Sequence, residues 1–514
     1  MDPNNKWNRW LLAGALPVIV GLFYISASGH FGYTPDDTYI YLQFAKNIIH
    51  GDGMAFNAGH PTYGFTSPLW LFIISAGGKL GVDLFYAAKV IDLLFASLGI
   101  VVFYLVAFET IRDVATSLCA TVAFSVNAWF LRWAGTGMET SLALILVLAV
   151  VLYCLRNEYF VSIFFAALAF VVRPETVILP FLVVIDLFVN SYSRKRAVQT
   201  AAALALMYVA LIAPWFIAAY RTFGTIIPNT FFAKSGIHPG FEALLATAAD
   251  IGKTVGATDG IAAVVMLLAG GFLLVILTRH NANLGEEVRQ ARFFLMRQSI
   301  IGVGWLVVLP AIYCLTDVNV MSRYLLLITP FITIYAFSFL HKAVENSSLR
   351  KHVYTAAFVL TAFVLVQNQL VYRAYVKPGM DAFQVGMSSC LIPIAVWFRE
   401  NTPADATLLA PDIGALGYYS GRTVLDAAGL ASPEFIPLLR QGLSPDSIIA
   451  KRLFGNMGDV DFVVQRSKMP GVQIPGDSLQ PLFAKPFYGL TIQDPHLTYY
   501  TVYKVQRTPS EVIR

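Results

Sequence analysis

About eleven apolar runs of roughly membrane-spanning length divide the first 371 residues of this 514-residue chain. A helix needs about 20 mostly apolar residues to cross a bilayer. The runs lie near 10–28, 84–109, 113–131, 139–155, 159–172, 174–191, 200–220, 258–278, 298–316, 323–342 and 353–371. Hydrophobic residues make up 57% of the chain and charged residues only 13%, which excludes a soluble globular protein. The sequence predicts an all-α polytopic membrane bundle of about 11 transmembrane helices.

Basic residues predict how the bundle is oriented. The run 68–80 is short and is broken by Gly77-Gly78, so we expect an interfacial helix there rather than a span. With this assignment, most loops on one side of the membrane carry Arg and Lys, with a cluster at Arg194-Lys195-Arg196. The positive-inside rule makes that side cytoplasmic. The formal net charge of +5 therefore orients the chain and does not indicate nucleic-acid binding. We predict a multi-pass protein of the inner (plasma) membrane, with a cytoplasmic N-terminus and a first outer loop over residues 29–83.

The tail beyond residue 371 changes character. Pro-rich turns separate β-branched runs at Ala406–Ala410, Val460–Gln465 and Thr498–Val505, and helical stretches lie near 388–400 and 445–454. These patterns predict a small extracytoplasmic α/β domain. The chain then divides into a transmembrane module, residues 1–371, and a C-terminal domain, residues 372–514.

The spacing of the four cysteines gives no strong signal for a metal site or a disulfide framework. Cys119, Cys154, Cys314 and Cys390 form no Cys-x-x-Cys pair, so neither a zinc site nor a disulfide framework is indicated. A disulfide between Cys314 and Cys390 stays open as an alternative, because both fall on the predicted outer side.

Two adjacent carboxylates, Asp36 and Asp37, follow the first apolar run. One interpretation is structural: Thr34 as an N-cap, Pro35 at the first helical position and Asp37 completing a capping box, with Gly51 ending an amphipathic interfacial helix. The other interpretation is functional, because few charges occur elsewhere and a carboxylate in the right place acts as a general base. Helix capping and catalysis both remain open at this point.

Several short motifs at predicted outer positions carry a family resemblance. In the first loop they are Asp36-Asp37, Asn57, Gly59, Gly64 and Thr66-Ser67-Pro68-Leu69-Trp70; later segments are Gly137-Met138-Glu139-Thr140, Arg173-Pro174-Glu175, Pro228 to Lys234, Ser322-Arg323-Tyr324-Leu325 and Asp412 to Ser420. Together they resemble the C-type integral-membrane glycosyltransferases, and most of all the bacterial arabinofuranosyltransferase-like members. The likeness extends over nearly the whole chain, although each motif is short.

The resemblance implies an enzyme and assigns roles to its carboxylates. A polyprenyl-phosphate donor would give its sugar, with arabinofuranose the leading case, to a hydroxyl of a glycan, lipid or protein acceptor on the outer face, with inversion. Asp36 would be the catalytic base. Asp37 would orient the acceptor, cap the helix or bind a divalent cation as a cofactor.

The resemblance also implies roles for residues at the outer ends of later spans. His60, Arg173, Lys234 and Arg323 would bind the donor phosphate, whose charge grows as it leaves. Glu139 would orient the acceptor, and Glu175 would contact substrate. The competing interpretation for each is a structural ion pair, Arg173 with Glu175 for example.

Two other function classes remain as alternatives. A lipid or sugar transporter would show repeated halves and polar residues near the membrane midplane, and we find no internal repeat. A polyprenyl-linked glycan polymerase or ligase would not require the Asp36-Asp37 pair.

Asp92 lies inside a predicted span, where a carboxylate needs a partner, and a structural hydrogen-bonding role is expected for it.

Overall fold

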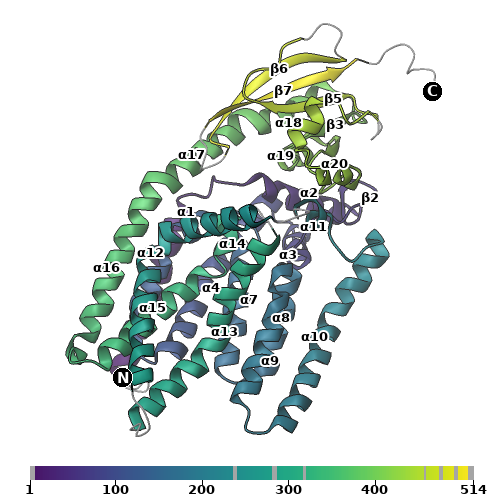
Figure 1. Ribbon diagram of the computed structural model, residues 1–514. Helices are drawn as coiled ribbons and strands as arrows, with labels where there is room; N and C mark the ends of the chain where they lie inside the picture. The colour runs from purple at the N-terminus through teal and green to yellow at the C-terminus, as the bar shows by residue number, and fades with distance from the viewer. Residues whose placement is uncertain are drawn as a thin grey trace.

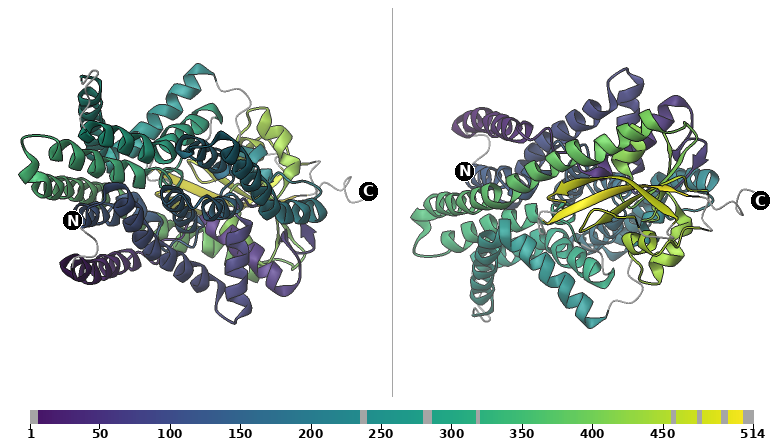
Figure 2. Two further views of the ribbon diagram at one scale, coloured as in Figure 1. Left: turned by 90° about the horizontal axis from the view of Figure 1, so that it is seen from below. Right: turned by 90° about the horizontal axis from the view of Figure 1, so that it is seen from above.

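The computed structural model describes residues 6–234, 240–279, 286–316, 320–455, 459–473, 478–490 and 496–506, with side chains not described at 6–11, 234, 276–279 and 286–299. A bundle of helices forms one part of the molecule, and a β-sheet with short helices forms the other (Figure 1). Seen from above, the sheet lies across one end of the bundle (Figure 2). The N-terminus lies near the opposite end.

The helical part is built from long apolar helices and short connecting ones. Their bounds are α1 Lys6–Ser28, α4 Leu84–Ile111, α5 Val114–Ser125, α6 Ala128–Trp133, α7 Thr140–Leu155, α8 Tyr159–Val172, η1 Pro174–Ile178, α9 Leu179–Asn190, α10 Arg194–Phe223, α11 Asn229–Lys234, α12 Phe241–Arg279, α13 Glu286–Thr316, α14 Ser322–Leu325, α15 Thr329–Glu345 and η2 Arg350–His352.

Within the described residues, four helical stretches are long and apolar enough to cross a membrane: Leu84–Ile111, Arg194–Phe223, Phe241–Val275 and Arg350–Asn401. Shorter apolar helices, such as Thr140–Leu155 and Tyr159–Val172, pack beside them. The protein is therefore a mostly helical, multi-pass membrane protein, as predicted. The number of about 11 spans stays a prediction.

Some predicted spans are interrupted for local reasons. The run 113–131 divides into α5 and α6 because the Asn127 side chain accepts hydrogen bonds from the Trp129 and Phe130 amides and so starts a new helix. The run 174–191 begins as the 3-10 helix η1, with Pro174 in its first turn. The run 323–342 divides into α14 and α15, and Pro330 lies in the first turn of α15.

A continuous helical stretch from Arg350 to Asn401 joins the two parts of the molecule (Figure 1). Its segments are α16 Val353–Val371, η3 Tyr372–Val376, α17 Lys377–Gly386, η4 Met387–Leu391 and α18 Ile392–Asn401, where η3 and η4 have π-helical hydrogen bonding. The predicted division at 371/372 falls within this stretch, so no loop marks it. The two-domain division stays a prediction.

The first loop contains two helices and a small hairpin: α2 Asp36–His50, β1 Ala55–Asn57, β2 His60–Pro61 and α3 Pro68–Lys79. The predicted helices are present, and α2 ends at Gly51, whose positive φ suits glycine. The predicted capping box is wrong. Pro35 occupies the N-cap position without a side-chain cap, because the Thr34 hydroxyl instead accepts a hydrogen bond from the Lys89 ammonium.

Lys89 and Asp92, on α4, connect the first loop to the turn before α7. The Lys89 ammonium donates to the Tyr33 carbonyl and to the Thr34 hydroxyl, both at 2.8 Å. The Asp92 carboxylate accepts from the Gly137 amide at 3.0 Å and from the Thr136 hydroxyl at 3.3 Å. The predicted structural role of Asp92 is confirmed, and the pair fixes the backbone that leads into Glu139.

A five-stranded sheet organises the C-terminal part. Its elements are β3 Thr407–Ala410, α19 Gly414–Ser420, β4 Thr423–Asp426, η5 Pro433–Phe435, α20 Ile436–Arg440, α21 Pro445–Ala450, β5 Phe462–Ser467, β6 Leu479–Tyr488 and β7 Leu497–Val505. The strand order is β4-β3-β5-β7-β6, with β4, β3 and β5 parallel and β6 and β7 antiparallel. The α/β character and the three expected strands are confirmed. The sequence interpretation missed β4, which is short, and β6, whose prolines suit an edge strand.

All four cysteines are free thiols. The alternative of a Cys314–Cys390 disulfide is therefore wrong.

Candidate functional site

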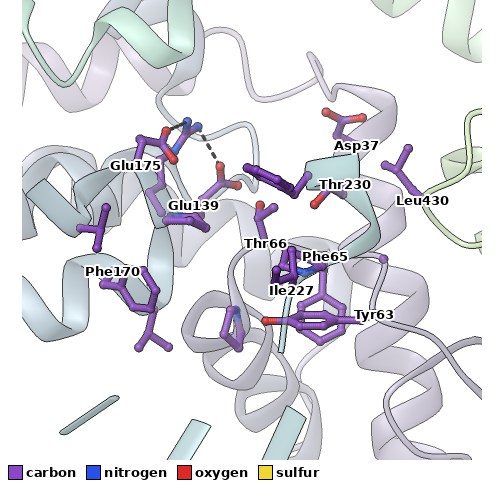
Figure 3. A pocket seen from close by; sticks show the side chains of 18 of the residues that line it. Asp37, Tyr63, Phe65, Thr66, Glu139, Phe170, Glu175, Ile227, Thr230 and Leu430 are labelled. Carbon is purple, nitrogen blue, oxygen red and sulfur yellow. Dashed lines mark hydrogen bonds and ion pairs between the residues drawn. The ribbon is translucent and has the colours of Figure 1, made fainter. Parts of the chain in front are cut away.

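A cavity of about 570 Å³ opens where the first loop, the helical bundle and the C-terminal part meet. Helices α2, α8, α10, α11, α13 and α14 contribute to its wall, and Leu430 comes from the C-terminal part. Figure 3 shows Glu139 and Glu175 on one side of this cavity and Asp37, Thr230 and Leu430 on the other. The cavity thus joins segments that are far apart in the sequence.

Arg173 anchors one side of the cavity. It lies directly after α8, and its guanidinium donates to Glu139 Oε1 at 2.8 Å and to Glu175 Oε1 at 2.9 Å. The Tyr313 hydroxyl also donates to Glu175, at 3.3 Å. Arg173 is 4% exposed, so a pair of carboxylates holds a buried cation in a fixed orientation. The predicted structural ion pair between Arg173 and Glu175 is present, inside the cavity rather than apart from it.

Arg323, on α14, lies beside Asp37 at the polar end of the cavity. Its Nη2 donates to Asp37 Oδ2 at 2.7 Å, and its guanidinium lies 5.5 Å from the Trp133 ring centre and 5.3 Å from the Tyr324 ring centre. The Tyr324 ring also contacts Arg173, at 4.9 Å. Stacking of this kind orients a guanidinium without neutralising it. Two arginines therefore share one tyrosine ring at the polar end of the cavity.

Three buried polar atoms at this end have no hydrogen-bond partner among the described residues: Glu139 Oε2, Arg173 Nε and Arg323 Nε. A buried polar group without a partner costs about 1–3 kcal/mol. Native proteins keep few such atoms, and a cluster of them in a cavity indicates a site that a polar ligand completes. The unpartnered set offers two cationic donors and one carboxylate acceptor.

The remaining wall is apolar. Phe170 and Val171 of α8, Trp215 and Phe216 of α10 and Ile312 of α13 line it. Only 6% of the most apolar 18-residue stretch of α10 is buried inside the protein. This helix therefore presents most of its surface to lipid. A cavity with arginines at one end and aromatic walls beside a lipid-facing helix suits an amphiphile with an anionic head.

Asp36 lies next to Asp37 in the chain but has different partners. Its carboxylate accepts from the Gly414 and Ala415 amides at the start of α19, both at 2.8 Å. Burial, followed by the nearby Asp412 carboxylate, raises the pKa of Asp36 to about 7. Asp36 does not line the cavity, and it connects α2 to the C-terminal part.

The predicted site residues thus fall into two groups. The structure brings together Asp37, Glu139, Arg173, Glu175 and Arg323 around one cavity. His60 lies exposed in β2 and Asp36 faces α19, so neither lines it. The side chain of Lys234, the last residue of α11, lies outside the described part of the chain.

Sequence reasoning missed other lining residues, among them Tyr41, Thr230, Tyr313 and Leu430. Thr230 lies within the Pro228 to Lys234 motif, which was a usable signal. Tyr41 lies one helical turn beyond Asp37 on α2, which also places it on the cavity side. Nothing local in the sequence marks Leu430.

The predicted divalent-cation site gains no support from this geometry. The described residues contain no group of three or more His, Cys, Asp or Glu side chains placed to hold a metal ion. Asp36 and Asp37 also bind different partners, so they do not form a shared pair of ligands. The cation stays a prediction.

Comparison with solved structures shows which fold this is. The crystal structure of ArnT from Cupriavidus metallidurans in the apo state matches with a TM-score of 0.55 and 13% identity, over 95% of this chain and 98% of that one. The ArnT structure with undecaprenyl phosphate bound matches with a TM-score of 0.56. The Archaeoglobus fulgidus oligosaccharyltransferase matches with a TM-score of 0.54 and 13% identity, over 90% of this chain and 70% of that one. The chain has the fold of the C-type integral-membrane glycosyltransferases. The predicted resemblance is confirmed at this level.

Sequence comparisons add two partial matches. The terminal β-(1→2)-arabinofuranosyltransferase of Mycobacterium tuberculosis is 28% identical over 248 residues, which are 44% of this chain and 38% of that protein. Residues 381–505 match a family described as a domain of unknown function (DUF8728). In this chain the C-type glycosyltransferase fold therefore includes a C-terminal part that is similar to a family described as a domain of unknown function.

Proposed function

We propose that this protein is an inverting glycosyltransferase that moves a sugar from a polyprenyl-phosphate donor to an acceptor hydroxyl. The observation that carries the proposal is the cavity with Arg173, Arg323 and Asp37 at its polar end and aromatic residues along its wall. Two structures with this fold support the choice of donor: one ArnT structure contains undecaprenyl phosphate, and an archaeal AglB structure contains a dolichol-phosphate.

The donor would lie with its isoprenoid chain along Phe170, Trp215 and Phe216 and its phosphate at the arginines. The phosphate oxygens would take the unpartnered Nε–H groups of Arg173 and Arg323. Stacking on Tyr324 holds both guanidiniums in place before the donor binds, so little reorganisation is needed as negative charge develops on the leaving phosphate. Glu139 Oε2 would accept a hydrogen bond from a hydroxyl of the donor sugar.

Asp37 is the base in this proposal. The acceptor oxygen forms a bond to the anomeric carbon, its proton passes to the Asp37 carboxylate, and the carbon–oxygen bond to phosphate breaks with its electron pair left on the phosphate. The ion pair with Arg323 holds the Asp37 carboxylate in place before the reaction. The family resemblance implied Asp36, the first of the pair, as the base. The hydrogen bonds from Asp36 to α19 instead support a positioning role for that residue.

The sugar and the membrane face belong to the proposal too. Arabinofuranose is favoured by the partial match to an arabinofuranosyltransferase. The cluster Arg194-Lys195-Arg196 starts α10 at the end of the bundle away from the sheet, so the positive-inside rule makes the cavity and the C-terminal part extracytoplasmic. The localisation proposed is the plasma membrane, with a glycan, lipid or protein as acceptor.

Transfer from a polyprenyl-phosphoryl arabinofuranose in proteoliposomes tests the proposal. Wild-type protein should form glycoside product and free polyprenyl phosphate, whereas Asp37→Asn should lose at least 100-fold in kcat while it still binds polyprenyl phosphate. A transporter would move the lipid across the bilayer without breaking the sugar–phosphate bond. Lipid movement without bond cleavage would refute the transferase function.

A further inference from the structure

One corner of the cavity is formed by Asp37 together with Thr230 and Leu430, and the proposed donor position gives Thr230 and Leu430 no role. Figure 3 shows the three side chains grouped on the side opposite Glu139 and Glu175. They come from α2, α11 and the segment after β4. A helix of the first loop, a short helix of the bundle and a loop of the C-terminal part therefore meet beside the proposed base.

Thr230 supplies an unused polar group in this corner. Its side chain lines the cavity and the residue is 6% exposed, yet its hydroxyl has no hydrogen-bond partner among the described residues. A hydroxyl that is buried without a partner destabilises the empty protein. A ligand hydroxyl at this place would remove that destabilisation.

Leu430 supplies an apolar surface that is held firmly. The Asp426 carboxylate accepts from the amides of Ala428, Leu430 and Ala431 at 2.6 to 2.9 Å, which shapes the loop after β4. The Asn229 side chain donates to the Leu430 carbonyl at 3.1 Å. Hydrogen bonds from within the C-terminal part and from α11 of the bundle therefore both hold this loop in place.

The first loop approaches the backbone of Leu430 closely at Gly64. A Cβ atom at Gly64 would lie 2.7 Å from the Leu430 carbonyl oxygen, which is closer than real contacts allow. Only glycine permits the approach, and Gly64 belongs to the first-loop motif noted in the sequence. The position of Leu430 beside the cavity thus depends on residues of three separate segments.

We propose that Thr230 and Leu430 form the acceptor subsite, and that the acceptor is a sugar; this inference rests on the proposed function. A sugar ring has an apolar face of C–H groups and an edge of hydroxyls. Leu430 would pack against the face, Thr230 would hydrogen-bond one hydroxyl, and a second hydroxyl would point to the Asp37 carboxylate. The DUF8728 region thereby contributes to the choice of acceptor through Leu430.

Binding measurements on the purified full chain test this subsite without turnover. The probes are undecaprenyl phosphate and a methyl arabinofuranosyl disaccharide, with a serine-containing peptide as the competing acceptor class. The variants are Thr230→Val, Thr230→Ser and Leu430→Ala, and the control is Leu482→Ala, at a residue 39% exposed on β6. We expect Thr230→Val and Leu430→Ala each to weaken disaccharide binding about fivefold, because each loses about one contact worth about 1 kcal/mol.

The same variants should bind undecaprenyl phosphate within about twofold of wild type, and Thr230→Ser and Leu482→Ala should bind both probes normally. The subsite is refuted if Thr230→Val and Leu430→Ala weaken lipid-phosphate binding instead, or change neither affinity. The sugar class is refuted if wild-type protein binds the lipid phosphate but not the disaccharide, or binds the peptide in its place. Failure of wild-type protein to bind undecaprenyl phosphate is a separate outcome that refutes the proposed function itself.

Discussion

Replacement of Arg323 by glutamine removes the cation that we place closest to both the base and the donor phosphate. Arg323 donates to Asp37 at 2.7 Å, stacks on Trp133 and Tyr324, and keeps an unpartnered Nε–H. A hydrogen bond to a charged group contributes about 1.5–3 kcal/mol, which corresponds to about 10- to 150-fold in Kd. We expect Arg323→Gln to weaken undecaprenyl-phosphate binding by that factor.

The assay is a titration of undecaprenyl phosphate into the protein in nanodiscs. Arg221→Gln is the matched control, because Arg221 is exposed in the last turn of α10 and does not line the cavity. Arg323→Lys should give an intermediate Kd, since lysine keeps the charge but not the forked geometry. The Asp37 side chain is 38% exposed, so loss of its ion pair should cost only about 1 kcal/mol of stability. Equal affinities for Arg323→Gln, Arg221→Gln and wild-type protein would refute the reasoning.

Two further predictions concern the contact between the first loop and the C-terminal part. Burial and the Asp412 carboxylate raise the pKa of Asp36 to about 7, from an ordinary value near 3.8. The folded protein therefore binds the Asp36 proton more tightly than the unfolded chain does. The contribution of Asp36 to the free energy of unfolding should fall as the pH rises from about 3.8 to about 7. Thermal unfolding of Asp36→Asn should show a flatter pH dependence from pH 4 to 8; identical slopes would contradict this. Asn57→Ala removes hydrogen bonds of 2.9 and 3.0 Å with the Val424 backbone, so hydrogen exchange at Val424 should accelerate about tenfold, and unchanged exchange would argue against this contact.

The sequence predicted those parts of the site that depend on position along a span. Glu139, Arg173 and Arg323 each lie at a helix end on the predicted outer side of the membrane. The positions of the apolar runs along the chain therefore predicted that these three residues lie near one another. The end of α2 at Gly51 followed from a local signal in the same way. Alternation and β-branched residues indicated the strands β3, β5 and β7.

Other features depend on contacts that no local pattern encodes. Asp36 and Asp37 look alike in the sequence, yet one meets the amides of α19 and the other meets Arg323. The expected Thr34 cap is absent because the Lys89 ammonium, distant in sequence, takes its hydroxyl. Leu430 reaches the cavity only because the sheet lies across that end of the bundle. Such features follow from tertiary packing, which overrides local propensity.

A density map of the protein with undecaprenyl phosphate bound tests the central claim most directly. The account predicts phosphate oxygens within about 3 Å of the guanidinium nitrogens of Arg173 and Arg323, with the isoprenoid chain along Phe170 and Trp215. Asp37 should face the phosphate end of the lipid without contacting its chain. A phosphate bound outside this cavity, or at the end of the bundle away from the sheet, would contradict the account.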